Sequence, residues 1–146
     1  MVECSRNLLK LKISDIVDTG GCEALDIVRS LTYQDVDVFV ICFSLDKFHT
    51  LENVHRKFIP EIRIYSQAHI VLVGTKLDLE NKNKEISAEV ARTREEAAKM
   101  RGKIKIENYI ECSAYSTEGV SQVFEAAVRV AMKRKQCNIN QNLNSC

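Results

Sequence analysis

Short apolar runs, separated by longer amphipathic stretches, dominate the pattern of this chain. Residues 38–43 and 70–73 are apolar throughout and rich in β-branched side chains, which is typical of parallel strands that are buried on both faces. Residues 108–112 are a weaker candidate of the same type, and residues 12–17 form a further candidate strand. The pattern therefore predicts a buried sheet.

Amphipathic patterns predict helices between these runs. Leu51, Val54, Phe58 and Ile62 follow a spacing of three to four residues, which is typical of a helix that buries one face. Pro60 should kink this helix or end it nearby.

A second apolar stripe has Ser116 or Thr117 as its expected N-cap. Its members are Val120, Val123, Phe124, Ala127 and Ala131. Thr93-Arg94-Glu95-Glu96 has the form of a capping box, so we expect another helix to begin there and to end at Gly102. Strands that alternate with helices predict an α/β sheet covered on both faces.

Composition mainly excludes function classes. The 146 residues suffice for one domain with a sizeable core, and a net charge of +1 offers no general attraction for nucleic acid. No apolar stretch approaches the roughly 20 residues that span a bilayer, and the N-terminus has no secretory pattern. His49, His55 and His69 lack metal-ligand spacing and are expected to face solvent. Cys42 and Cys112 are expected to pack as free thiols in a reducing cytoplasm.

Two polar segments, each after an apolar run, predict a site for a guanine ring. They are Gly74-Thr75-Lys76-Leu77-Asp78 and Glu111-Cys112-Ser113-Ala114. The carboxylate of Asp78 can accept hydrogen bonds from the ring N–H and the exocyclic amine of guanine, a two-point contact that adenine cannot make. The N–H of Ala114 would serve the guanine carbonyl, the stem of Lys76 would lie along the ring, and Ser113 would hold Asp78. A plain strand-to-helix turn is the alternative.

The placement of these residues supports a shared site. Ligands of parallel sheets bind beyond the carboxyl ends of the strands. Asp18 follows residues 12–17, Thr75 follows residues 70–74 and Ser113 follows residues 108–112, so we expect these three residues to meet at one edge of the sheet.

From about residue 11 to residue 135 the chain resembles a small GTPase of the Rho/Rac kind. The matching segments occur in the order of that family: Asp18-Thr19-Gly20-Gly21, residues 37–44, Leu51-Glu52-Asn53-Val54, residues 74–78 and residues 111–114. The resemblance implies a P-loop-NTPase-like α/β fold with a doubly wound, mostly parallel sheet, incomplete here because the first strand and first helix are lacking. It also implies GTP or GDP with Mg²⁺ as ligands, and exchange factors, effectors and GTPase-activating proteins as partners. Residues 81–90 would hold a reduced form of the extra surface helix of Rho-type proteins.

The phosphate side of the site is expected to be deficient. None of the five glycines is followed by four residues and then Gly-Lys-Ser/Thr, the pattern that wraps phosphates, so the phosphate loop and the first switch would lie before Met1. By the resemblance, Asp18 would reach Mg²⁺ through water and the N–H of Gly21 would sense the terminal phosphate. Cys22 stands where the family has the Gln that orients the attacking water, so we expect impaired hydrolysis. A reactive thiol at Cys22 is an alternative without an adjacent base.

The size of the expected hydrogen-bond energies predicts weak binding of the nucleotide. Charged hydrogen bonds at Asp78 contribute roughly 1.5–3 kcal/mol each, whereas micromolar affinity requires about 8 kcal/mol after the cost of association. Base contacts alone therefore predict millimolar binding. Val17-Asp18-Thr19-Gly20 also matches an aspartic-protease signature, but that chemistry needs two facing loops, and this sequence has one.

The C-terminal region carries candidate membrane contacts. Lys133, Arg134 and Lys135 followed by Cys137 resemble a polybasic-plus-lipid ending, with Cys137 as the candidate site of lipidation. A solvated helix end, whose positive charges suit the helix dipole, is the alternative. The domain would span residues 1–135, and the Asn-rich residues 136–146 are expected to be disordered. These features place the chain in the cytoplasm, with a peripheral position at the inner face of the plasma membrane as an option.

Three interpretations follow. The first is a guanine-nucleotide switch with impaired nucleotide chemistry. The second is a nucleotide-free pseudo-GTPase that presents the helices around residues 51–62 and 18–30 to the same partners. The third is a fragment of a longer active Rho GTPase. Lost ladder bonds at about 1 kcal/mol each would rival the 5–15 kcal/mol stability of a domain, so we expect a marginal fold, re-paired strands or completion by a longer protein.

Overall fold

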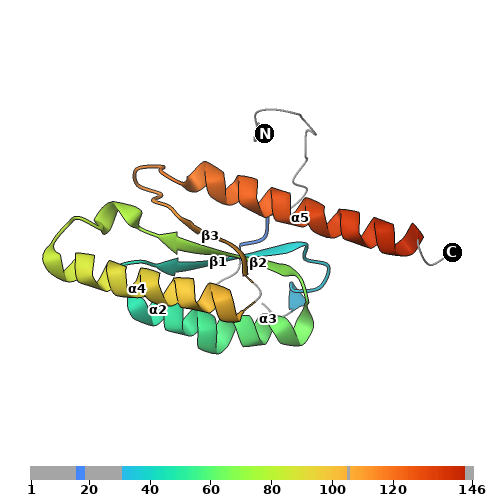
Figure 1. Cartoon of the computed structure of the whole chain (residues 1–146), viewed down its shortest axis with the longest axis horizontal. Coiled ribbons are helices and arrows are strands. Elements are labelled where there is room, and N and C mark those ends of the chain that lie inside the picture. The colour runs from blue at the N-terminus through green and yellow to red at the C-terminus, as the bar shows by residue number, and fades with distance from the viewer. Residues whose placement is uncertain (1–15, 19–30, 105, 144–146) are drawn as a thin grey trace.

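A three-stranded parallel sheet forms the centre of the molecule. The computed structural model describes residues 16–18, 31–104 and 106–143. Strands β1 (Val38–Ser44), β2 (His69–Thr75) and β3 (Ile106–Glu111) lie in the order β1-β2-β3. Helices cover both faces of the sheet (Figure 1), which confirms the predicted α/β architecture.

The central strand is β2, and its position explains its composition. β1 pairs with β2 from Val38 opposite His69 to Ser44 opposite Thr75, and β3 pairs with the other side of β2. Residues 70–73 are at most 1% exposed, because both edges and both faces of this strand are covered. The predicted strands at residues 38–43 and 70–73 are confirmed, and the weaker one begins two residues earlier than expected, at Ile106.

Two hydrophobic clusters lie on opposite faces of the sheet. On one face, α2 (Phe48–Asn53), α3 (Ile59–Tyr65) and α4 (Lys84–Lys103) cover the larger cluster. On the other face, α5 (Val120–Leu143) covers a smaller cluster. Figure 1 shows these two layers below and above the strands.

The helix around Pro60 is distorted but continuous. A π-helical turn, η2 (Val54–Phe58), joins α2 to α3, and Pro60 lies in the first turn of α3. Pro60 has no N–H to donate to the carbonyl of Arg56, so the turn before it widens instead of closing a regular α-helical bond. The predicted kink thus takes the form of a wide turn.

Helix α4 begins earlier than the sequence predicts. Its N-cap is Asn83, whose side chain accepts a 2.8 Å hydrogen bond from the N–H of Ile86. Thr93 is fully buried in mid-helix, where its hydroxyl donates to the carbonyl of Glu89. The predicted start at Thr93 and end at Gly102 are therefore wrong, since the helix continues to Lys103. The polar residues 84–90, expected to hold a separate reduced helix, form its first turns.

Helix α5 also differs in detail from the prediction. It begins at Val120, directly after Gly119, so neither Ser116 nor Thr117 is the N-cap. Val123 is buried as predicted, but Phe124 is 38% exposed. The buried stripe continues instead through Ala126 and Val130, and Val120 packs against the same cluster on this face of the sheet.

Two further predictions, the strand at residues 12–17 and the disordered tail at residues 136–146, concern the ends of the chain. Residues 16–18 are exposed and form no strand, so the predicted strand at 12–17 does not include its last two positions, and its remainder lies outside the described residues. Helix α5 continues to Leu143, into the segment 136–146 that was expected to be disordered. No Gly or Pro interrupts residues 120–146, which leaves the helix without a stop signal there.

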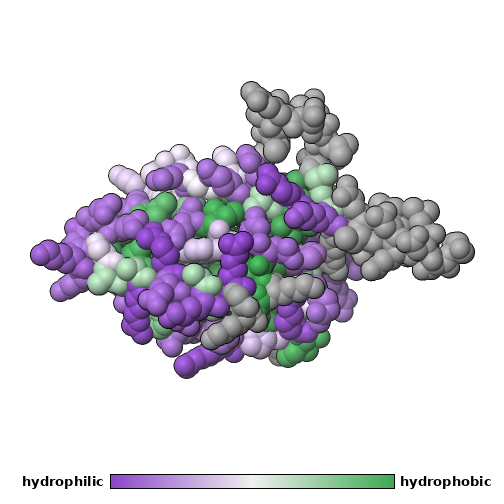
Figure 2. All heavy atoms as spheres, in the orientation of Figure 1, coloured by the Kyte–Doolittle hydropathy of each residue, from purple (hydrophilic) through white to green (hydrophobic). Residues whose placement is uncertain are grey.

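The surface shows where apolar residues remain uncovered. The face in Figure 2 is largely hydrophilic, with apolar patches between the elements. β1 is an outer strand of the described sheet, and its Val40 is 42% exposed, in keeping with the incomplete sheet that was predicted. In the described part of the chain, no helix combines the length and the apolar character that a membrane crossing needs.

Candidate nucleotide-base site

The two predicted base-binding segments lie side by side at the carboxyl ends of β2 and β3. The N–H of Cys112 donates to the carbonyl of Gly74 at 2.8 Å, and the N–H of Leu77 donates to the carbonyl of Cys112 at 3.1 Å. These bonds extend the pairing of β2 and β3 beyond the strands. The structure therefore brings together the two segments that the sequence places more than thirty residues apart.

Ser113 and Asp78 are in direct contact. Ser113 is fully buried, and its hydroxyl donates a 2.5 Å hydrogen bond to Oδ1 of Asp78. The same hydroxyl accepts the N–H groups of Tyr115 and Ser116, each at 3.1 Å. Asp78 itself is exposed. The result is an oriented carboxylate at the surface, supported from beneath by the predicted partner.

Lys76 is held by a residue that the sequence analysis missed. Its backbone is left-handed, with φ 63°, and its Nζ lies 3.5 Å from Oδ1 of Asp46. Asp46 also accepts a short hydrogen bond from the hydroxyl of Ser44. Desolvation acts to raise the pKa of Asp46, but the bond from Ser44 and the charge of Lys76 outweigh it and lower the pKa. Asp46 lies two residues after the end of β1, and this position was the signal that could have identified it.

Two further contacts shape the site. The hydroxyl of Thr75 donates to the carbonyl of Phe43 at 2.8 Å, which ties the end of β2 to β1. Ala114 is exposed in the loop of residues 113–119, which closes through the bond from Ser113 N–H to the carbonyl of Glu118. A Cβ at Gly119, where φ is 76°, would lie 2.2 Å from the carbonyl oxygen of Glu111. Only glycine fits this close approach.

Arg94 of α4 contacts both segments and was also missed. Its guanidinium forms ion pairs with Glu80 at 2.8 Å and with Glu111 at 2.6 Å. Glu80 lies two residues after Asp78, and Glu111 two residues before Ser113. In the sequence, Arg94 looked like part of a capping box, because nothing local signals a partner so distant.

The phosphate side of the predicted site is only partly described. Asp18 is exposed and close enough to Cys42 that its charge, after desolvation and the neighbouring Cys112, raises the pKa of that thiol. Gly21 and Cys22 lie outside the described residues. In the described ranges, no group of three or more His, Cys, Asp or Glu side chains could hold a metal ion. Among the residues described at this position, Asp18 offers one exposed carboxylate, and Mg²⁺ takes six oxygen ligands, several of them commonly water.

The remaining candidates from the sequence have mixed outcomes. His49 and His55 are exposed as expected, but His69 is half-buried and its Nδ1 lies 2.9 Å from Oε1 of Glu107 on β3. The prediction of a solvent-facing His69 is wrong because strand pairing brings β2 and β3 together. Cys112 is buried as predicted, whereas Cys42 is exposed, since it lies on the outer strand β1.

The C-terminal cluster is described in part. Lys133 is exposed on α5, and the backbone of this helix includes Arg134, Lys135 and Cys137. The side chains of these last three residues lie outside the described part, so the predicted membrane contact and lipidation stay predictions.

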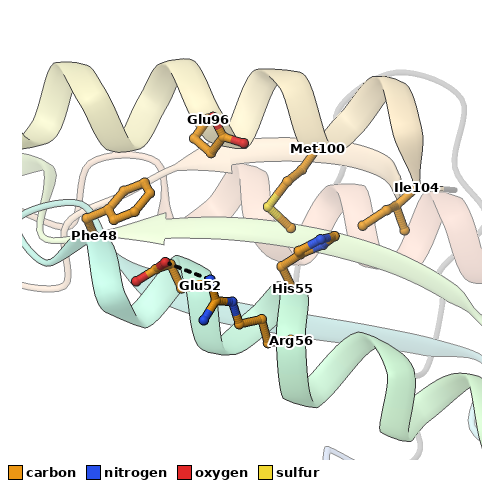
Figure 3. Close-up of a pocket in the computed structure, with 7 residues that line it drawn as sticks. All are labelled: Phe48, Glu52, His55, Arg56, Glu96, Met100 and Ile104. Carbon is orange, nitrogen blue, oxygen red and sulfur yellow. Dashed lines mark ion pairs between the residues drawn. The ribbon is translucent and has the colours of Figure 1, made fainter.

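A surface hollow of about 180 Å³ lies apart from the base site. Figure 3 shows that Phe48, His55 and Met100 approach it from facing helices, and that Glu52 and Arg56 form an ion pair at its rim. It lies between α2, η2 and α4 and contains none of the predicted site residues.

Comparisons with known proteins agree with the motifs. The model of the Ras family matches residues 2–133. Over 136 residues the chain is 37% identical to "Rho-related GTP-binding protein RhoB" of Homo sapiens, an alignment that covers 88% of this chain and 69% of the relative. The proteins of the same name from Mus musculus and Rattus norvegicus match equally well. With this coverage and with the base-motif segments in the order of that family, the chain belongs to the Ras family of small GTPases, in its Rho-type branch.

Proposed function

We propose that this chain is a Rho-type signalling domain that recognises the guanine base of GTP or GDP through Thr75, Lys76, Asp78, Ser113 and Ala114. The observation that carries the proposal is the hydrogen bond from Ser113 to Asp78. It joins the two base motifs and holds the carboxylate that would read the base.

The chemistry of the site supports guanine over adenine. An ionised carboxylate only accepts hydrogen bonds, and guanine offers two donors on one edge, the ring N–H and the exocyclic amine. The bond from Ser113 takes part of the accepting capacity of Oδ1 and fixes the plane of the carboxylate, while the side chain stays exposed. Adenine has an unprotonated ring nitrogen where guanine has the ring N–H. It would therefore place an acceptor against the carboxylate of Asp78, and that hydrogen bond would be lost.

We propose that binding is weak and hydrolysis impaired in this chain. Base contacts contribute roughly 1.5–3 kcal/mol per charged hydrogen bond. Without contacts to the phosphates, this is too little for tight binding of the nucleotide. Asp18 and Gly21 would face the phosphates and Mg²⁺. When bound, Mg²⁺ would neutralise part of the charge of the phosphates. Cys22 would replace the water-orienting Gln, and a thiol is a weak hydrogen-bonding group.

The partners proposed for this domain follow from its family. They are exchange factors, effectors and GTPase-activating proteins, with no nucleic acid. A cytoplasmic position with peripheral contact to the inner face of the plasma membrane, through Lys133, Arg134, Lys135 and Cys137, is part of the same proposal. A nucleotide-free interaction module is the second candidate.

Titration of the ¹⁵N-labelled full chain with GMP, with AMP as the comparison, tests the base site. We expect shifts of the Leu77 and Ala114 amide signals with GMP and a dissociation constant in the millimolar range. Asp78→Asn should weaken GMP binding by about tenfold or more, since it replaces a charged acceptor. Glu118→Gln, the same carboxylate-to-amide change in the neighbouring loop, is the matched control and should have little effect.

Two outcomes contradict the proposal in different ways. Equal responses to GMP and AMP would exclude a guanine site and favour the nucleotide-free module. Calorimetric titration with GDP and Mg²⁺ that gives submicromolar affinity would show that the phosphates are held after all, and the proposed weakness would be wrong.

A further inference from the structure

The guanidinium of Arg94 links the two base-binding segments through a double fork of hydrogen bonds. Towards Glu111, Nε donates to Oε1 at 2.7 Å and Nη2 donates to Oε2 at 2.6 Å. Towards Glu80, Nη1 donates to Oε1 at 2.8 Å and Nη2 donates to Oε2 at 3.2 Å. One planar group thus grips two carboxylates in bidentate fashion, which is the strongest geometry for this pair of groups.

The two carboxylates stand at the bases of the two loops. Glu80 closes the turn that carries Asp78, where its N–H donates to the carbonyl of Leu77. Glu111 is the last residue of β3, immediately before Cys112 and Ser113. A shift of either carboxylate would therefore move one side of the Ser113–Asp78 contact.

Arg94 is itself anchored by the rigid part of the fold. It follows the fully buried Thr93 on α4, and Val90 and Ala97 of the same helix belong to the larger hydrophobic cluster. The hydroxyl of Tyr109 adds a 2.6 Å hydrogen bond to Oε1 of Glu111, and its ring stacks on Phe43 of β1. The fork is thus fixed to the core at one end and to the loops at the other.

The electrostatics of the cluster agree with this geometry. The bond from Arg94 lowers the pKa of Glu80. Desolvation acts to raise the pKa of Glu111, but the bonds from Arg94 and Tyr109 outweigh it and lower the pKa. Both carboxylates are therefore charged acceptors at neutral pH.

We propose that Arg94 is a positioning residue for guanine recognition, which holds the Asp78 loop and the Ser113 loop in register by binding Glu80 and Glu111 together. The inference rests on the proposed function, since it assigns to α4 the geometry of that same base site. Arg94 touches no ligand itself and acts through the two glutamates.

This role requires an arginine, because the side chain must hold two carboxylates in fixed positions at the same time. A lysine offers a point charge on a flexible stem and contacts one carboxylate well at a time, whereas the fork of Arg94 contacts four carboxylate oxygens. Arg94→Lys should therefore restore only part of what Arg94→Gln loses.

The test compares Arg94→Gln, Arg94→Lys and the matched control Arg92→Gln in the full chain. Arg92 lies on the same helix, but it contacts Glu89 and the ring of Phe48, away from both loops. The first readout is amide hydrogen exchange of Leu77, whose N–H bonds the carbonyl of Cys112 across the loops. The second is the ratio of affinities for GMP and IMP, because IMP lacks the exocyclic amine that Asp78 would bind.

We expect Arg94→Gln to speed the exchange of Leu77 by about fivefold or more, the effect of a partly exposed ion-pair network. Exchange of Val71 at the centre of β2 reports any change in global stability, so the expected effect is a speed-up at Leu77 that exceeds the one at Val71. The preference for GMP over IMP should fall by a similar factor, because a misplaced carboxylate loses the second contact. Arg94→Lys should lie between, and Arg92→Gln should match the wild type.

The outcomes separate this inference from the proposed function. Unchanged Leu77 exchange, or a lower stability with an unchanged GMP-to-IMP ratio, would overturn the positioning role. A wild-type chain that does not distinguish GMP from AMP would refute the proposed function and with it the role in guanine recognition, and Leu77 exchange would then still show whether Arg94 couples the loops. If Arg94→Gln fails to fold by circular dichroism, Arg94→Lys carries the comparison, and wild-type behaviour in both readouts would overturn the proposal.

Discussion

Single side chains decide the shape of the base site more than the regular elements do. Asp78 is exposed, yet its carboxylate is oriented by the buried hydroxyl of Ser113. Lys76 adopts a left-handed backbone, and Asp46 holds its amine. A sparsely populated conformation of this kind persists only where its surroundings enforce it. Here the ion pair with Asp46 and the bond from the N–H of Leu77 to the carbonyl of Cys112 do so.

Stability should fall in acid because of the carboxylates around Arg94. The pKa values of Glu80 and Glu111 are lower in the folded chain than the ordinary 4.5. Their contribution is therefore fully present above about pH 4.5 and lost as the pH falls through the lowered values. Urea unfolding at neutral pH and near pH 3.5 measures it.

Arg94→Gln provides the control for this pH dependence. At neutral pH it should lower the free energy of unfolding by about 1 kcal/mol, since the ion pairs are partly exposed. Near pH 3.5 the difference between the variant and the wild type should shrink, because below about pH 4.5 the glutamates of the unfolded chain take up protons and part of the advantage of the folded ion pairs is lost. An equal difference at both pH values would mean that the charges of these glutamates do not stabilise the fold.

At the residue scale, sequence motifs identified one part of the site and not the other. Thr75, Asp78 and Ser113 could be named because each follows an apolar run within a short motif. Arg94 could not, because Glu80 and Glu111 are distant in sequence and a lone Arg in a polar segment carries no local signal. Asp46 was missed although its place just after β1 was a signal. Cys22 and Gly21 lie outside the described residues, so their roles stay predictions.

Two local sequence patterns compete for the start of helix α4. The capping-box pattern at Thr93 and the cap at Asn83 are both legitimate start signals, and the structure uses the earlier one. The apolar faces of Val90 and Ala97 explain this choice, since both are buried in one cluster and require one continuous helix across Thr93. Packing decided between two equivalent local signals.

Substitution of the two candidate caps distinguishes these starts. Asn83→Ala should lower the free energy of unfolding by about 1 kcal/mol, the usual cost of losing an N-cap. Thr93→Val keeps the shape of the buried side chain and should cost at most about 0.5 kcal/mol, the low end for one hydrogen bond. Chemical denaturation measures both, and a larger loss for Thr93→Val than for Asn83→Ala would contradict the observed start of α4.

The whole molecule is organised around β2. Its residues 70–73 are covered by helices on both faces and by β1 and β3 at both edges. The outer strand β1 is different, because Val40 and Cys42 on it are exposed. Stability is therefore concentrated in the centre of the sheet, which also anchors the segment that carries Asp78.

Truncation of side chains should show that the central strand contributes more to stability than the outer strand. Leu72→Ala should lower the free energy of unfolding by about 2–5 kcal/mol, as for other buried leucines. Val40→Ala, the matched truncation on the outer strand, should cost less than about 1 kcal/mol because the side chain is already partly in solvent. Equal losses in urea denaturation would show that β1 is covered in solution by something that the described residues do not include.

The order of short motifs along the chain was enough to determine the family, the parallel sheet and the residues that would read a base. These depend on local composition: β-branched runs specify buried strands, and a motif keeps its residues together wherever the chain folds. Only the tertiary structure decided that Asn83 caps α4, that His69 meets Glu107, and that Arg94 joins the loops of Asp78 and Ser113. Such contacts arise when packing brings distant segments together, and no local pattern encodes the partner.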